Sequence, residues 1–488
     1  MRRAAALGIA IGLASCTVGP DYAPPPLELP NAWSRGAAAN ASPSGTEDAQ
    51  ILARWWRSFG DPTLSSLVER SLEASLDVAM ARARVREARA AERVSGAGDT
   101  PALGSQAAYT RERLSGQGFI GGFLPDPEFD LFQAGFDASW EIDVFGGRRR
   151  AVEAARAEVE AAEEGVRDVQ VLLAAEVART YVTLRGSERR SAIADRNLAS
   201  QRSSLALTED RFRAGLAGEL DVAQSRALLA TTEAARPRLE AERDRALHRL
   251  GVLLGRAPEA LRGELAVHAD IPGASDPEAL ARRIPVGLPS ELLRRRPDLR
   301  RAERGLAAAT ARIGVATAEL FPSFALTGAL GLESIAIGDF LDVASRTYSL
   351  GPSIRWPIFE GGRIRAQIEA ADAREQQALE AYRKAVLESL EDVENALSGF
   401  ARERVRHGQL VAAADASRRA VELARDLYRN GLATFLQVLD AERTLYAAED
   451  AVVVSDGVVA FELVALYKAL GGGWDPSNLG APVAGQAS

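Results

Sequence analysis

The residue best suited to covalent chemistry in this chain is its single cysteine, Cys16. Two arginines, a short apolar run and the small residues Ala14 and Ser15 precede it. A basic start, a short apolar stretch and small residues at a cleavage point form a secretory signal peptide, whereas a membrane-spanning helix needs about 20 apolar residues. A cysteine just after that point resembles the thiol that is acylated in bacterial lipoproteins. We therefore expect residues 1–15 to be removed and Cys16 to carry a lipid anchor.

The residue after Cys16 and the overall charge indicate where such a chain resides. Thr17 stands in place of the aspartate that typically retains lipoproteins in the inner membrane, which favours the outer membrane. Lysines and arginines number 59 against 67 aspartates and glutamates, so the chain is mildly acidic and offers no basic face to nucleic acid. The alternative is an ordinary signal peptide followed by an incidental cysteine.

The other candidates for chemistry do not form a site in the sequence. His248, His268 and His407 are scattered, and none has a second ligand type at metal-binding spacing. GQGFIG at 116–121 fits the glycine pattern of dinucleotide sites, but it lies between two strand patterns rather than in a βαβ unit. No serine, cysteine or histidine arrangement supports nucleophilic catalysis. We expect no enzyme activity, no cofactor and no metal site.

The elements that carry the remaining motifs occur twice. RFRAGLAGELDV at 211–222 aligns with LYRNGLATFLQV at 427–438, an offset of 216 residues, and upstream segments align at an offset near 221. A period this long indicates a duplicated domain rather than a solenoid. The predicted organisation is a signal peptide (1–15), a lipid-anchored extended segment (16–60), a first repeat (61–255), a linker (256–289), a second repeat (290–473) and a flexible tail (474–488).

Each repeat is predicted to contain a helix, a hairpin of strands and a long helical hairpin. Helical patterns cover 61–99, 147–213 and 217–254 in the first repeat, and 290–319, 362–429 and 433–471 in the second. The longest segments lack proline and, at a rise of about 1.5 Å per residue, extend about 100 Å. Pro237 should kink its helix or end it.

Glycines punctuate both repeats. The tips Gly215–Leu216–Ala217 and Gly431–Leu432–Ala433 are helix C-terminal signals, because glycine adopts the left-handed conformation that ends a helix. In WEIDVFGGR and WPIFEGGR, the pairs Gly146–Gly147 and Gly361–Gly362 are expected to turn the chain from strand to helix.

Four segments alternate between apolar residues and small or polar ones, which indicates β-strands. They cover 102–112, 132–143, 324–332 and 348–356, within expected hairpins of 102–143 and 323–358. Runs of about 9–11 such residues with aromatic ends are typical of outer-membrane strands. A half-buried soluble sheet is the alternative. Pro352 falls on the apolar face, so we expect a bulge or an unpaired position there.

Four strands cannot close a membrane barrel, and a lipid-exposed open edge is not tolerated. The barrel must therefore be shared: two chains would give eight strands and a filled interior, whereas three would give twelve and room for a pore. The long helices favour three. The predicted fold class is mixed α+β: a trimeric 12-stranded outer-membrane barrel with four strands per chain, continued by a long α-helical coiled-coil barrel.

Several of these motifs are similar to those of the TolC-like outer membrane efflux family, in its NodT-type lipoprotein branch. They are CTVGPDYAPP after the signal peptide, WPIFEGGR, YRNGLATFLQVLDAERTLY and LYKALGGGW. The resemblance covers essentially the whole mature chain. It implies a homotrimer in the outer membrane that extends into the periplasm as the exit duct of a tripartite efflux pump. It also implies a periplasmic adaptor and an inner-membrane transporter, commonly of the RND class, as partners.

The resemblance also places the functional residues. Leu436 and Asp440 match the positions whose side chains close the periplasmic end as rings, and the two tips match the grooves that meet the adaptor. The family often has a second acidic residue where this chain has Gln437, so a double acidic ring is in doubt. The alternative for Asp440 is a solvated carboxylate on a helix face, and for the tips a plain helix cap.

Two other functions stay open at this point. One is the outer-membrane component of a type I secretion system, in which an ABC transporter exports proteins. The other is a structural lipoprotein, a coiled-coil spacer without a pore, against which the strand alternation argues. The sequence does not identify the cargo, although drugs or other toxic amphiphiles are our expectation.

Overall fold

The computed structural model describes residues 17–34, 46–115, 117, 119, 128–274 and 276–475. Cys16, the predicted signal peptide, most of the 116–121 motif and the residues beyond 475 lie outside the described residues. The chain divides into two compact units that cut across the repeats. Unit 1 comprises 1–26, 84–162 and 301–383, and unit 2 comprises 27–83, 163–300 and 384–488.

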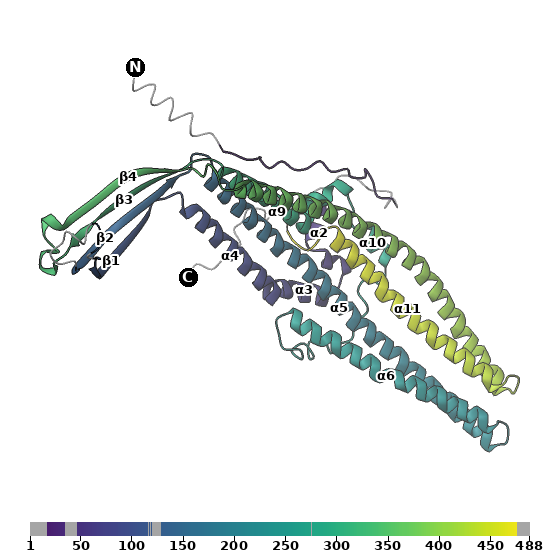
Figure 1. Ribbon diagram of the computed structural model, residues 1–488. Helices are drawn as coiled ribbons and strands as arrows, with labels where there is room; N and C mark the ends of the chain where they lie inside the picture. The colour runs from purple at the N-terminus through teal and green to yellow at the C-terminus, as the bar shows by residue number, and fades with distance from the viewer. Residues whose placement is uncertain are drawn as a thin grey trace. The chain divides into compact units, whose positions relative to one another are not determined.

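The order of elements repeats as predicted (Figure 1). The first repeat contains α3 (Pro62–Ala74), α4 (Leu76–Ala97), β1 (Ala102–Arg113), β2 (Glu128–Ile142), α5 (Gly147–Arg213) and α6 (Glu219–Leu253). The second contains η4 (Pro289–Glu291), α8 (Leu292–Arg295), α9 (Pro297–Ala318), β3 (Ser323–Ser334), β4 (Arg346–Arg355), α10 (Arg363–Arg429) and α11 (Phe435–Ala469). The shorter elements are α2 (Thr46–Ala53), η2 (Trp55–Phe59), α7 (Pro277–Arg282), η5 (Ile337–Asp339) and η6 (Val343–Ser345).

The helices predicted over 61–99 and 290–319 are each broken once, which the sequence patterns did not indicate. Ser75 is extended between α3 and α4, and its hydroxyl accepts a hydrogen bond from the Asp77 amide, as a helix N-cap does. Arg296 is extended between α8 and α9 because it precedes Pro297, which disfavours the helical conformation before it. The two breaks are separated by 221 residues, the offset of the upstream repeat.

Pro237 does not end its helix, because α6 runs unbroken through it. The proline is exposed, so the carbonyl that loses its intrahelical partner can be hydrated by water. Of the two outcomes predicted for Pro237, an end of the helix was therefore wrong, and a kink stays a prediction. The two longest helices, α5 and α10, each contain 67 residues, as predicted.

Unit 1 contains one antiparallel sheet in the order β1-β2-β3-β4. The register aligns Phe136 with Leu330 and Trp140 with Leu326, so the apolar residues of neighbouring strands share a face. Most of this face is open in the single chain; Leu103, Leu350 and Ile354 among others are more than half exposed. Since an apolar face of this size needs a cover, lipid on that face accounts for its composition.

Pro352 needs no bulge. The register of β4 on β3 is continuous, with Pro352 opposite Leu326. Within one chain β4 is an edge strand, where the missing N–H of proline is tolerated.

The two strand-to-helix turns differ in their use of glycine. Gly146 has a φ of +81°, but Gly147 is already the first residue of α5. A Cβ on Gly147 would lie 2.8 Å from the Cβ of Ala318, so this glycine is required for close packing against α9. In the second turn Gly361 and Gly362 both have positive φ, at +57° and +89°.

Unit 2 contains an aromatic core, in which Trp55 stacks on Tyr467 at 5.2 Å between ring centroids. Both side chains are fully buried. None of the helices in the described part of the chain has a long enough apolar stretch to cross a membrane.

Candidate periplasmic aperture

The two helical hairpins in unit 2 end in tips with the same backbone geometry. Gly215 has a φ of +71° and Gly431 of +73°. At each tip the leucine after the glycine donates its amide to the carbonyl five residues back, Leu216 to Arg211 and Leu432 to Leu427, at 2.8 Å in both cases. This 6→1 bond is the mark of the Schellman motif. The predicted caps are thus confirmed as helix ends.

The tip leucines project into solvent. Leu216 is 67% exposed and Leu432 75%, while Ala217 and Ala433 are half-buried. Two exposed apolar side chains beside glycine-capped turns are suited to contact another protein. Whether they meet an adaptor stays a prediction.

The predicted aperture residues lie on the exposed face of the first turns of α11. Leu436 is 58% exposed, and the side chain of Asp440, one turn later, is 64% exposed. Residues four apart on a helix face the same way, so the structure places the two together as predicted. Asp440 accepts a hydrogen bond of 2.9 Å from Arg443, an ion pair that the sequence analysis did not anticipate. Both partners are exposed, so this pair contributes little to stability.

The opposite face of the same turns is buried. Phe435, Val438 and Tyr428 form a cluster against which Leu207 of α5 packs. The guanidinium of Arg211 lies 4.7 Å above the Tyr428 ring and donates to the Tyr428 carbonyl at 3.0 Å. The tip of the second hairpin is therefore attached to the first hairpin through both apolar and polar contacts.

A second polar link between the hairpins was missed in the sequence. Glu442 of α11, only 5% exposed, accepts hydrogen bonds from Arg425 of α10 at 2.6 Å and from Ser204 of α5 at 2.5 Å. Arg425 also donates to Ser200 of α5. One carboxylate thus joins three helices just above the predicted aperture. The 216-residue offset contains a signal only for the pair within the hairpin, because it aligns Arg425 and Glu442 with Glu209 and Arg226; it does not indicate the contacts with α5.

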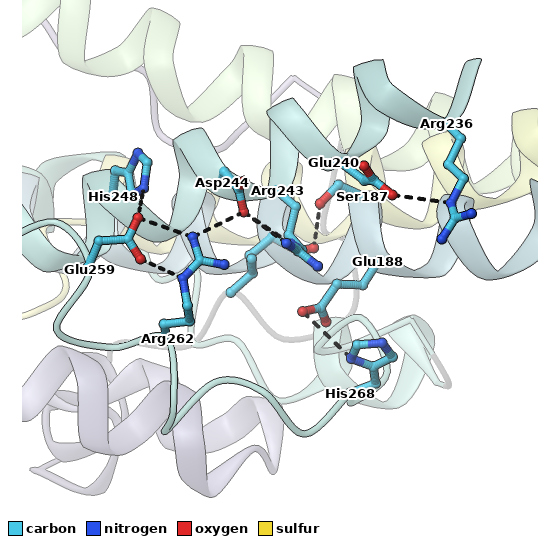
Figure 2. A network of polar contacts seen from close by, with 11 residues as sticks. Ser187, Glu188, Arg236, Glu240, Arg243, Asp244, His248, Glu259, Arg262 and His268 are labelled. Carbon is cyan, nitrogen blue, oxygen red and sulfur yellow. Dashed lines mark hydrogen bonds and ion pairs between the residues drawn. The ribbon is translucent and has the colours of Figure 1, made fainter. Parts of the chain in front are cut away.

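Each of the three histidines lies beside a carboxylate in unit 2. His248 is 2.7 Å from Glu259, whose carboxylate also accepts from Arg262, and Figure 2 shows this chain of contacts continuing to Asp244. Hydrogen bonds from Arg262 and His248 lower the pKa of Glu259 to about 2. The contacts are those of a surface network, and no group of three or more metal-type ligands occurs among the described residues.

The other two histidines pair with more buried acids. His268 lies 3.8 Å from Glu188, and Figure 2 marks this contact with a dashed line. His407 of α10 contacts Asp456 of α11 at 2.7 Å, and the Asp456 side chain is 8% exposed. Burial raises the pKa of Asp456, an effect that the nearby His407 opposes.

Comparison with known proteins agrees with this architecture. The family model described as "Outer membrane efflux protein" matches residues 67–256 and 288–472. The pyoverdine export outer membrane protein OpmQ of Pseudomonas aeruginosa is 35% identical over 98% of each chain. Nodulation protein T of Rhizobium leguminosarum bv. trifolii is 32% identical over 95% of this chain and 96% of that one.

Solved structures agree at the level of the whole fold. The outer-membrane channel OprN superposes with a TM-score of 0.85 at 40% identity, covering 94% of this chain and all of that one. CusC superposes with a TM-score of 0.79 at 27% identity over the same shares of the two chains. The predicted fold class, a shared strand barrel continued by a helical barrel, is thereby confirmed, as is the outer-membrane location with a periplasmic extension. The chain belongs to the outer membrane efflux protein family.

Proposed function

We propose that this chain is the exit duct of a tripartite pump, trimeric, lipid-anchored through Cys16 and gated at the periplasmic end by Leu436 and Asp440. The observation that carries the gating is the division of α11 into two faces. Phe435 and Val438 are buried against the neighbouring helices, whereas Leu436 and Asp440 on the other face have no cover in the single chain. In a threefold assembly a face of this kind is directed to the axis.

The chemistry of these two residues suits a gate. Three leucines around an axis exclude water, and three carboxylates one turn away attract cations and repel one another. The Asp440–Arg443 ion pair moderates this repulsion. Opening requires the second hairpin to move away from the axis, which means a change in its contacts with the first hairpin.

The partners follow from the absence of an energy source in the duct itself. We propose a periplasmic adaptor that meets the tips at Leu216 and Leu432, and an inner-membrane transporter of the RND class. The relatives' names cover export of pyoverdine, efflux of toluene and efflux of cations. Such varied cargo on one architecture indicates that the transporter selects the cargo. For this chain we propose small toxic amphiphiles.

A deletion strain complemented with the intact gene tests this function. Hypersensitivity to chemically unrelated apolar drugs, dyes or detergents, reversed by the gene, is the expected result. Normal susceptibility together with the loss of a secreted protein would overturn it in favour of type I secretion. Complementation with a Leu216→Asp, Leu432→Asp double variant separates the duct from its partners, because this variant should form channels but fail to restore resistance.

A further inference from the structure

The motif TVGPDY, residues 17–22, is bound in a site within unit 1 that we call its seat, formed by the start of α5, the turn before it and α9. The Val18 amide donates to the Phe145 carbonyl at 3.0 Å, next to the turn where β2 passes into α5. Four residues later, the Tyr22 hydroxyl donates to Glu303 of α9 at 3.1 Å, and the Arg304 guanidinium lies 5.4 Å from the Tyr22 ring. The motif therefore bridges the first and second repeats.

One buried arginine at the start of α5 holds the middle of the motif. Arg150 is 3% exposed, and three of its hydrogen bonds go to the motif: to the Val18 carbonyl at 3.1 Å, the Gly19 carbonyl at 3.2 Å and the Asp21 carboxylate at 2.6 Å. A fourth goes to Glu153 at 2.8 Å. Burying a guanidinium is costly unless its donors are satisfied. Here the motif supplies most of the acceptors, so the seat is complete only when the motif is docked.

Close packing of the motif against α9 also requires glycine at two positions, which the hydrogen bonds alone do not require. Gly19 has a φ of +88°, and a Cβ on it would lie 2.3 Å from the Cα of Gly314 in α9. A Cβ on Gly314 would in turn lie 2.7 Å from the Arg150 side chain. Two glycines facing each other allow residues 17–26, which we call the strap, to approach α9 within backbone contact.

We propose that residues 17–22 are a docking motif that fixes where the lipid anchor leaves the protein, with Arg150 as its positioning residue. The proposal rests on lipidation of Cys16, which belongs to the proposed function. Only Thr17 lies between Cys16 and Val18, so the Cα atoms of these two residues are at most about 7 Å apart. The docked motif thus begins at Phe145, three residues after Ile142, where the apolar face of the sheet begins. The lipid anchor and the sheet then enter the same leaflet at one fixed position, and they are not connected by a flexible linker.

Cleavage of the strap tests the docking. A protease site is inserted between Pro26 and Leu27, the purified full-length protein is captured by a C-terminal tag in mild detergent and cut, and the retained fragment 16–26 is quantified by mass spectrometry. We expect the fragment to stay bound to the otherwise unchanged protein. Arg150→Gln should release it at least tenfold faster, whereas Arg149→Gln, on the exposed side of the same turn, should not. All variants share the same detergent, so retention through the micelle is equal among them.

The outcomes separate the two claims. The fragment's mass reports acylation: a retained fragment without lipid would leave the docking standing and sink the lipidation. Immediate release from the unmutated protein, or equal retention in Arg150→Gln, would overturn the docking. If Arg150→Gln does not fold, Tyr22→Phe and Gly19→Ala serve instead, since each alters only the strap; release unchanged in both would contradict the proposal.

Discussion

The two helical hairpins are equivalent in their place in the repeat and in backbone geometry, yet equivalent side chains differ in how far they are exposed to solvent. Glu209 and Arg226 of the first hairpin form an exposed ion pair at 2.7 Å. The equivalent positions in the second hairpin, Arg425 and Glu442, form the same pair with the charges exchanged, and Glu442 is buried against α5. Both hairpins thus retain the same ion pair, but only in the second does the carboxylate of the pair also contact the other hairpin, at α5. The second hairpin is thus the one whose movement is restrained.

The same contrast extends along the helices. Phe435, buried at the second tip, corresponds to Glu219 at the first, and buried Asp456 corresponds to the exposed Glu240. Arg418–Glu449 and Arg202–Glu233, by contrast, are the same ion pair in both copies, at 3.0 Å and 2.8 Å. The second hairpin, which contains the candidate gate, therefore differs from the first at buried positions, whereas the exposed ion pair is the same in both.

Removing the buried carboxylate of Glu442 should produce the largest difference between the two hairpins. Glu442→Ala leaves Arg425 without its main partner and should lower the free energy of local opening of the second tip by about 3 kcal/mol. Arg226→Ala in the first hairpin should cost less than about 1 kcal/mol, because that pair is exposed. Hydrogen exchange of α11 and α6 amides measures both. Equal protection losses in the two variants would contradict the assigned difference.

Asp440→Ala tests the charge at the aperture. The variant should conduct more in its resting state in a planar bilayer, and block by divalent cations should weaken, because the acidic ring is lost. Gln224→Ala, the equivalent position in the first hairpin, is the matched control and should leave both properties unchanged. Unaltered conductance and cation dependence in Asp440→Ala would remove Asp440 from the aperture.

The tip glycines should respond alike, since the two caps are identical in geometry. Gly215→Ala and Gly431→Ala each force a residue with a Cβ into the left-handed region, at about 1 kcal/mol. Gly218→Ala, at an N-cap with a φ of −87°, should cost much less. Hydrogen exchange at the tips measures the losses. A clear difference between Gly215→Ala and Gly431→Ala would show that the second tip is strained beyond its cap.

The smallest effect concerns pH. Burial raises the pKa of Asp456, so the folded chain retains a proton that the unfolded chain has released. The stability that this group contributes is present below its ordinary pKa and is lost as pH rises through the raised one. Asp456→Asn should flatten thermal stability against pH in that window, whereas Glu240→Gln should not. A pH profile of Asp456→Asn identical to that of the unmutated protein would sink this assignment.

Much of this fold was readable in the sequence because its signals are periodic. Strand alternation, proline-free helices and glycine caps predicted the four strands, both 67-residue helices and both tips. The breaks at Ser75 and Arg296 and the persistence of α6 through Pro237 depend on single residues and their local exposure, which periodicity does not report. The Glu442 link and the Arg150 seat join residues more than 120 positions apart, and only tertiary packing brings them together.

The most direct test of the gate is a thiol placed at Leu436. The unmutated chain contains one cysteine, Cys16, which we propose is acylated, so Leu436→Cys introduces a single reactive thiol. Three copies near the axis should bind cadmium, and micromolar cadmium should block single-channel conductance in planar bilayers. Leu220→Cys, the equivalent position in the first hairpin, should be unaffected. Block in both variants, in neither, or in Leu220→Cys alone would contradict the assignment of the gate to the second hairpin.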